Sequence, residues 1–473
     1  MNIDISYRRI LALAGPVVIT QMTHTAMGLI DAMMVGRLGV VALAGVGLGA
    51  IISWWLLGFF VGLLQGVNTF VAQFFGAGKK DRVGVAFWQG LYLAAGAGVA
   101  VLLAAPLSGW AFRVMGASPE VQAIATDYTE VRLGAAVGLM IFLVAENYYR
   151  GLGRTEVPMF AGLLQLALNC GLNYLLIFGV WGFPELGAAG TAVGTVIAQF
   201  LVAVGLLAGV LATKIGRDYG ATRPRPPEAA LLGQMLRVSL PIGVQVFMEM
   251  GGISVFTALV ANLGDAEMAA TNAVIHAWSV SFMLAVALAV GCTTLVGQCL
   301  GARQLDDVRV VVRRVMWLGY GAMAIMAVIY VGFPGWLMQL FAREAGDLAA
   351  LLPYARPLFL ICTLCLIFEL PFNIYSGALR GAGDTTYPMV VNIGVAWLVF
   401  VPLVFFATRN WGLVGAWSCF IVHVGLLAAL LAVRVRGRTW IERGASLLDA
   451  ERAAGGATAR VSDVDDLRSS PAL

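Results

Sequence analysis

Three acidic residues stand inside long apolar stretches, where charged side chains are unusual. Asp31 lies in MGLIDAMMVG, Glu249 in QVFMEMGGIS and Glu369 in CLIFELPFNI. An ionised carboxylate is costly in a bilayer, so it faces the interior of a helix bundle or a water-filled space, and it is a functional candidate. The chemistry that fits is the uptake and release of a proton or another cation. The alternative is a structural carboxylate that accepts hydrogen bonds from a nearby hydroxyl or backbone donor.

A second group of candidates is uncharged. Asn169 and Asn173 are four residues apart, on one face of a predicted helix, and Thr195 lies in the next apolar stretch. Together with Asp31 they offer a carboxylate, two amide oxygens and a hydroxyl, which are hard-oxygen ligands suited to Na⁺ or to a proton relay. The residues alone leave open a second interpretation, in which the amides only bridge neighbouring helices.

The composition identifies the elements that must position these residues. Of 473 residues, 12% are charged and 60% hydrophobic, and the mean hydropathy is +0.87. Soluble domains are about one quarter charged, so the composition excludes a cytosolic enzyme, a disordered chain and a secreted disulfide scaffold. We do not expect nucleic-acid binding, because no basic face interleaved with aromatic residues is present. The six cysteines all stand in apolar stretches and are predicted to be small buried hydrophobic residues.

About 20 apolar residues cross a bilayer as a helix, and the chain contains twelve such runs. The predicted fold is therefore an all-α polytopic membrane protein with spans at about 10–36, 45–75, 86–108, 123–149, 157–180, 187–213, 236–263, 269–300, 310–333, 349–379, 387–408 and 412–434. Lys and Arg are concentrated in alternate loops, which predicts that both termini are cytoplasmic.

The two halves of the chain repeat each other. Pro16 corresponds to Pro241, 225 residues later, and the same offset relates the longer motifs. The first of these motifs is Gly66-x-x-Thr69-x-Val71-x-Gln73-x-x-Gly76, which matches Gly291-x-x-Thr294-x-Val296-x-Gln298-x-x-Gly301. The second is Gly187-x-x-Gly190, which matches Gly412-x-x-Gly415. A third motif, Arg150-Gly151-x-Gly153, matches Arg380-Gly381-x-Gly383 at a slightly larger offset. Six spans per half make the repeat parallel, so we expect a substrate site between two lobes near the bilayer midplane.

The repeat and the charge pattern divide the chain into four parts. We predict an N-lobe at 1–213, a proline-rich cytoplasmic linker at 214–235, a C-lobe at 236–434 and a disordered cytoplasmic tail at 435–473. The chain lacks the phosphate-binding loop of ATP-driven transporters and any catalytic motif that we recognise. We therefore expect a transporter driven by an ion gradient, not an enzyme.

These motifs resemble those of the multidrug and toxic compound extrusion (MATE) family, over residues 8–435. The resemblance rests on Pro16, the two Gln motifs and three segments: Asp31-x-x-Met34-x-Gly36-x-Leu38-Gly39, Leu379-Arg380-Gly381-x-Gly383-Asp384-Thr385 and Gly412-x-x-Gly415-Ala416. It implies two six-helix lobes around a central cavity and export of cationic, amphipathic compounds in exchange for Na⁺ or H⁺, without a cofactor. It also implies a multi-pass protein of a bacterial inner membrane, which we expect to be monomeric.

The same resemblance assigns roles to the candidate residues. It implies that Asp31 with Asn169, Asn173 and Thr195 forms a cation site, in which Asp31, Asn169 and Asn173 are the Na⁺ ligands. Glu249 and Glu369 match the carboxylates of the seventh and tenth helices in the NorM-like branch, except that Glu369 stands where that branch carries Asp. We expect both to couple cations and, with Asp31, to bind substrate. The alternative is a flippase for lipids or lipid-linked oligosaccharides, and the acidic interior charges argue against the basic cavity it would need.

Overall fold

Helices form both halves of the molecule, without a β-strand in the described residues. A computed structural model of the chain describes residues 2–114, 118–339 and 345–445. The first half contains α1 Tyr7–Gly36, α2 Val40–Gly76, α3 Lys80–Ala104, α4 Leu107–Val114, α5 Pro119–Gly134, α6 Ala136–Gly151, α7 Glu156–Phe178, η1 Val180–Gly182 and α8 Ala188–Ala212. The second half contains α9 Lys214–Asp218, α10 Ala229–Ala261, α11 Asp265–Gly301, α12 Leu305–Gly332, α13 Pro334–Gln339, α14 Ala345–Gly381, α15 Thr386–Gly394, the π-helix η2 Val395–Phe400 and α16 Val401–Arg436.

The helices account for all twelve predicted spans. Ten helical stretches of the described chain are long and apolar enough to cross a membrane, and α5 with α6 forms an eleventh, bent by 50°. One of the ten, residues 386–436, has 51 residues, which at 1.5 Å per residue is more than twice the thickness of a bilayer core. It divides into two spans at Gly412, whose φ of 60° and ψ of −151° are not helical. The predicted all-α fold is confirmed.

The backbone confirms the internal repeat. Residues with positive φ recur at corresponding turns of the two halves, where a left-handed backbone ends one helix before the next begins. The pairs are Gly39 (112°) with Gly264 (148°), Gly78 (70°) with Arg303 (60°), Gly153 (73°) with Gly383 (76°), and Gly187 (55°) with Gly412 (60°). The sequence offset therefore reports a repeated helix-and-turn pattern, with six spans in each lobe.

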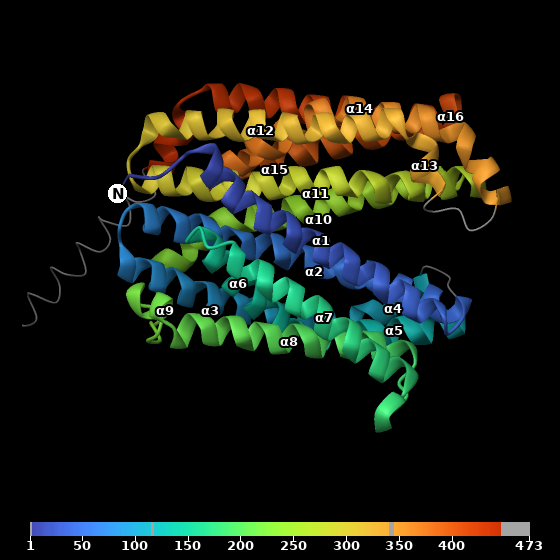
Figure 1. Cartoon of the computed structure of the whole chain (residues 1–473), viewed down its shortest axis with the longest axis horizontal. Coiled ribbons are helices and arrows are strands. Elements are labelled where there is room, and N and C mark those ends of the chain that lie inside the picture. Colours follow the sequence, from blue (N-terminus) through green and yellow to red (C-terminus); the bar gives the residue numbers. More distant parts are fainter. Residues whose placement is uncertain (1, 115–117, 340–344, 446–473) are drawn as a thin grey trace, which may run out of the picture.

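The N-terminal part of the first helix of each lobe packs in the core of the other lobe. Ile10 and Leu13 of α1 lie in the hydrophobic core of the C-lobe, whereas Met235 and Val238 of α10 lie in the core of the N-lobe. These are corresponding positions of the repeat. In Figure 1 the two groups of helices meet near the N-terminus and lie farther apart at the opposite end. We call the end that carries the N-terminus the closed end.

The linker is shorter than predicted and is packed against the N-lobe. Helix α10 begins at Ala229, so the last residues of the predicted linker are helical. Trp88 Nε1 of α3 donates a hydrogen bond to the carbonyl oxygen of Ala221 at 2.9 Å, and Gln89 Nε2 donates one to that of Pro226 at 3.0 Å. The connection between the lobes is therefore attached to α3 along much of its length.

The start of the predicted tail belongs to the C-lobe. Residues 439–445 are helical, and Trp440 and Ile441 are buried in the C-lobe core. The prediction of disorder from residue 435 overlooked this apolar pair, which is isolated among charged residues. Residues 446–473 lie outside the described residues, so the prediction for them is not addressed.

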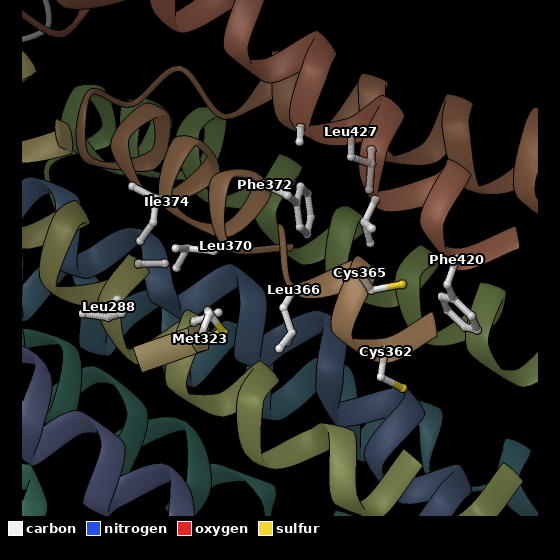
Figure 2. Packing of buried hydrophobic residues seen from close by; sticks show 14 of the residues in the cluster. Leu288, Met323, Cys362, Cys365, Leu366, Leu370, Phe372, Ile374, Phe420 and Leu427 are labelled. Carbon is white, nitrogen blue, oxygen red and sulfur yellow. The ribbon is translucent and has the colours of Figure 1, made fainter. Parts of the chain in front are cut away.

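Helix α14 passes through the C-lobe core and carries Glu369. Figure 2 shows Cys362 and Cys365 of this helix among apolar side chains that include Phe420 of α16. Both cysteines are buried, as are Cys292, Cys299 and Cys419, and Cys170 is half-buried. The prediction that the cysteines pack as small hydrophobic residues is confirmed for five of the six. The surrounding apolar contacts fix the position of the helix around Glu369.

Candidate functional site

The four residues predicted to bind a cation in the N-lobe come together. Asn173 Nδ2 of α7 donates a hydrogen bond to Asp31 Oδ1 of α1 at 2.6 Å. Asn169 Nδ2, one turn earlier on α7, donates to Thr195 Oγ1 of α8 at 2.9 Å. Asn169 and Thr195 also interact with the Asp31 carboxylate. Since the four residues come from three helices, their convergence is a result of the packing of α7 between α1 and α8.

The oxygen atoms of this group are available to a ligand. Asn169 and Asn173 are fully buried, yet neither Oδ1 atom has a hydrogen-bond partner in the described part of the chain. A buried acceptor without a partner is costly, about 1–3 kcal/mol. In the structure the amide nitrogens point to Asp31 and Thr195. Rotation of either amide would turn its oxygen toward a cation beside Asp31, and the carboxylate would balance the charge of that cation. The donor set fits Na⁺, and it equally fits a protonated carboxylate stabilised by amides.

One cation near this group was not foreseen. Arg132 of α5 acts electrostatically on Asp31, and its Nε atom is buried without a partner in the described residues. The sequence analysis did not single out Arg132. Its position four residues after Tyr128, which is also buried, places it on the inner face of α5. The N-lobe site therefore has a fixed positive charge in its surroundings.

Glu369 is enclosed within the C-lobe. The residue is 2% exposed, and Trp278 Nε1 of α11 donates a hydrogen bond to its Oε2 atom at 2.8 Å. Its Oε1 atom is buried without a partner in the described chain. One carboxylate oxygen is therefore held by the lobe itself, and the other is left for a proton or an ion.

Glu249 lies at the boundary between the lobes. It is half-buried on α10, one turn after Gln245, and so on the same helix face. Arg380 Nη2 donates a hydrogen bond to Gln245 Oε1, and Arg380 Nη1 donates one to Gln65 Oε1 of the N-lobe, both at 3.3 Å. The Arg380 charge also acts on Glu249. Two residues before Glu249 on α10, the ring of Phe247 stacks on that of Trp55 of α2, with ring centroids 4.4 Å apart.

Arg380 corrects one statement of the sequence analysis, which found only acidic charges in the interior. The repeat shows why its side chain turns inward. The corresponding Arg150 pairs with Glu146 at 2.7 Å within α6. Four residues before Arg380 stands Ser376, not an acid. Because α14 offers Arg380 no carboxylate, its guanidinium reaches glutamines of both lobes.

The predicted carboxylates form two sites, one in each lobe. Asp31 belongs to the N-lobe group, whereas Glu249 and Glu369 belong to the C-lobe, where each acts electrostatically on the other. Among the described residues, no three His, Cys, Asp or Glu side chains are grouped as a metal site would require. Any ion bound here must therefore use amide, hydroxyl or backbone oxygens in addition to carboxylates.

The repeated Gln motifs join the lobes at the closed end. Thr69 and Gln73 of α2 donate side-chain hydrogen bonds to the carbonyl oxygens of Arg380 and Gly381, both at 2.9 Å. In the reverse direction, Thr294 and Gln298 of α11 donate to those of Arg150 and Gly151, at 3.3 and 2.9 Å. We call these four hydrogen bonds the interlobe clamp.

The glycines of the same motifs let the two helices approach closely. A Cβ atom at Gly76 would collide with the carbonyl oxygen of Gln298, and one at Gly301 would collide with that of Gln73. Since the collisions are reciprocal, both motifs need glycine for the same contact. The sequence analysis found these motifs as a repeat but gave them no role.

Comparisons with known proteins agree with this architecture. The sequence profile of the MatE family matches residues 16–175 and 241–406, one segment in each lobe. The fold is similar to that of the eukaryotic MATE transporter AtDTX14, with a TM-score of 0.82 and 18% identity over 92% of this chain and 97% of that one. A MATE in the bent conformation gives a TM-score of 0.81 and 22% identity over 92% and 96% of the two chains. An outward-facing multidrug resistance MATE family transporter gives 0.78 and 21% over 93% and 96%.

Proposed function

Because the chain belongs to the MatE family, whose members are membrane transporters and not enzymes, we propose that this transporter exports cationic, amphipathic compounds in exchange for Na⁺ or H⁺. The observation that carries the proposal is the N-lobe group, in which Asp31 accepts a hydrogen bond from Asn173 and the Oδ1 atoms of Asn169 and Asn173 are buried without partners in the described residues. Such a group can bind a cation, because the two amide oxygens have no other partner among the described residues. The C-lobe supplies a second acidic site, at the boundary between the lobes.

The features around Glu249 favour a cationic substrate with an aromatic part. The carboxylate attracts a positive charge, and the stacked rings of Trp55 and Phe247, two residues earlier on α10, offer an aromatic contact between the lobes. Trp55 belongs to the N-lobe and Phe247 to the C-lobe, so a relative movement of the lobes would separate the pair. Arg380 competes with the substrate for Glu249. This arrangement suits a compound that must be released after each cycle.

The contacts between the lobes support alternating access. The interlobe clamp and the exchanged ends of α1 and α10 hold the closed end together. The concentration of Lys and Arg in the loops at that end supports placing it on the cytoplasmic side. We therefore propose that the structure represents the outward-facing state of a protein in a bacterial inner membrane, with both termini in the cytoplasm. Ion binding at Asp31 and substrate binding at Glu249 would then favour different arrangements of the lobes.

Transport of a dye by the purified protein tests this function. We expect proteoliposomes that contain the protein to move ethidium when a Na⁺ or an H⁺ gradient is imposed alone, because either ion fits the N-lobe group. The measurement is ethidium fluorescence with each gradient in turn, and with neither. Transport without any gradient, or none with both gradients present, would contradict coupled exchange. The comparison of the two gradients identifies the coupling ion.

Glu249→Gln is expected to weaken the binding of a cationic dye about a hundredfold, because a desolvated charge pair contributes roughly 2.7 kcal/mol. Equilibrium binding of ethidium to detergent-purified protein measures this without any gradient. Glu369→Gln is the matched control, since Glu369 is enclosed and already hydrogen-bonded to Trp278. We propose that Glu369 serves the coupling ion, so its substitution should leave dye affinity close to that of the wild type. Unchanged affinity in Glu249→Gln would exclude direct contact between Glu249 and the dye.

A further inference from the structure

A basic cavity opens on the outer side of the C-lobe at the closed end. It has a volume of about 460 Å³ and lies between α12, α14, α16 and the segment that follows α16. Its walls include Arg309, Arg313 and Arg436 together with Trp317, Tyr320 and Trp440. The cavity is separate from both candidate sites, because none of the residues that line it belongs to either site.

The three arginines offer positive charge that is not neutralised locally. The residues that line the cavity include no Asp or Glu. Arg309 Nη2 donates hydrogen bonds to the carbonyl oxygens of Arg436 and Gly437, at 3.1 and 3.4 Å. These contacts hold Arg309 at the mouth of the cavity without neutralising its charge. The guanidinium groups of Arg313 and Arg436 are exposed, and within the described part of the chain neither forms an ion pair.

The order of residues along α12 matches the layers of a bilayer. Arg309, Arg313 and Trp317 follow one another at intervals of four residues, so they lie on one side of the helix, and Val328, eleven residues after Trp317, lies on the same face as that tryptophan. Trp317 is 68% exposed and Val328 is 66% exposed. From Arg309 to Val328 the helix rises about 28 Å. The face therefore passes from charged, through the aromatic type typical of the membrane interface, to apolar.

In the N-lobe, the surface that corresponds to this cavity is covered by the linker. The counterparts of Arg309, Arg313 and Trp317 are Gly84, Trp88 and Tyr92, and the linker covers all three. A Cβ atom at Gly84 would meet the backbone of Gly220 at 2.5 Å. Trp88 donates to the carbonyl oxygen of Ala221, and Tyr92 Oη donates to that of Arg225 at 2.7 Å.

The C-lobe has a cavity where the N-lobe has protein. There, the segment after α16 contacts Arg309 through the carbonyl oxygen of Gly437 and adds Trp440 to the cavity wall, but it does not fill the cavity. The space left below has the size of a lipid headgroup, with apolar walls from Val312, Met316 and Ala432.

We propose that this cavity binds an anionic phospholipid, with the phosphate between Arg313 and Arg436 and the acyl chains along Trp317 and Val328. Planar guanidinium groups bind phosphate oxygens in pairs, and basic pockets between membrane helices on the cytoplasmic side bind anionic headgroups. The assignment to the inner leaflet rests on the orientation given under Proposed function. The binding itself does not, and it is measured without transport.

Native mass spectrometry of the full-length protein in detergent tests the proposal. Phosphatidylglycerol and phosphatidylcholine with the same acyl chains are titrated, and we expect the protein to retain phosphatidylglycerol at least about tenfold more tightly. Arg313→Gln combined with Arg436→Gln should lower the affinity for phosphatidylglycerol about thirtyfold and leave phosphatidylcholine unaffected. Equal retention of the two lipids, or a double variant that behaves like the wild type, overturns the proposal.

Three further measurements keep the result specific. Arg217→Gln combined with Arg223→Gln removes two exposed arginines from the surface of the N-lobe, and it should change nothing. An equal loss of affinity in that control would show that the effect depends only on net charge, and it would refute the site.

Water-soluble glycerophosphoglycerol should not displace the lipid; displacement at equal concentration would indicate a site for free phosphate compounds instead. Deletion of residues 446–473 should leave lipid binding unchanged, and lipid binding that appears only after the deletion would make that segment the occupant.

Discussion

Asp31→Asn is expected to reduce ion-driven efflux about a hundredfold, while expression and membrane insertion stay close to the wild type. The carboxylate is the only acid in the N-lobe group, and losing an ionised ligand costs a few kcal/mol of cation binding. An amide oxygen at the same position still accepts the hydrogen bond from Asn173 Nδ2. The packing of α1 against α7 should therefore persist. The measurement is dye efflux from proteoliposomes under each gradient, with the amount of inserted protein determined separately.

Glu146→Gln is the matched control for this variant. It also removes one carboxylate from the N-lobe, but from the ion pair with Arg150, whose side chains are only 4% and 8% exposed. Breaking a buried pair leaves an unpaired charge and costs about 3–5 kcal/mol of stability. We expect less folded protein, with normal coupling in the molecules that do fold. If Asp31→Asn transported normally per molecule, the amides would be structural bridges between helices and the cation site would be refuted.

The sequence predicts the architecture well because membrane spans and their repeat are encoded over many residues. The match of Gly187 with Gly412 at an offset of 225 residues corresponds to one repeated turn with the same backbone conformation. Spans are less certain where helices bend or merge. The bend between α5 and α6 falls inside one apolar run, and the helical stretch 386–436 contains two spans. An apolar run predicts that a span is present, but it does not predict where the helix of that span bends.

The candidate site was predictable only where short spacing fixes the geometry. Asn169 and Asn173 share a helix face, and the structure brings them to Asp31 and Thr195. Arg380 was not predictable, because an arginine at the end of a span extends either toward water or back along the helix. Its direction depends on Gln65 and Gln245, which are distant in sequence. In general, contacts between the lobes leave no periodic pattern in the amino-acid sequence of either lobe.

Gln73→Leu combined with Gln298→Leu is expected to open the closed end. Each substitution removes a hydrogen bond of the interlobe clamp and leaves the carbonyl oxygen of Gly381 or Gly151 buried without its donor. An unsatisfied buried group costs about 1–3 kcal/mol, so the pair shifts the balance of states by roughly 2–6 kcal/mol. About 5.5 kcal/mol converts a ratio of 1:99 into 99:1. The population of the opposite state should therefore become large, and each single variant should give about half the shift in free energy.

Distances between spin labels at both ends measure this shift. Arg217 and Arg438 are exposed near the closed end, and Val40 and Asp265 are corresponding exposed residues at the opposite end. In a cysteine-free background, the double variant should lengthen the first distance and shorten the second. Gln89→Leu is the control, because Gln89 is also buried and bonded to a carbonyl oxygen, but that oxygen belongs to Pro226 of the linker. Gln89→Leu should leave both distances unchanged, since it breaks no contact between lobes. If Gln73→Leu and Gln298→Leu moved neither pair of labels, the clamp would only stabilise the fold, and the closed end would be held by the exchanged ends of α1 and α10 alone.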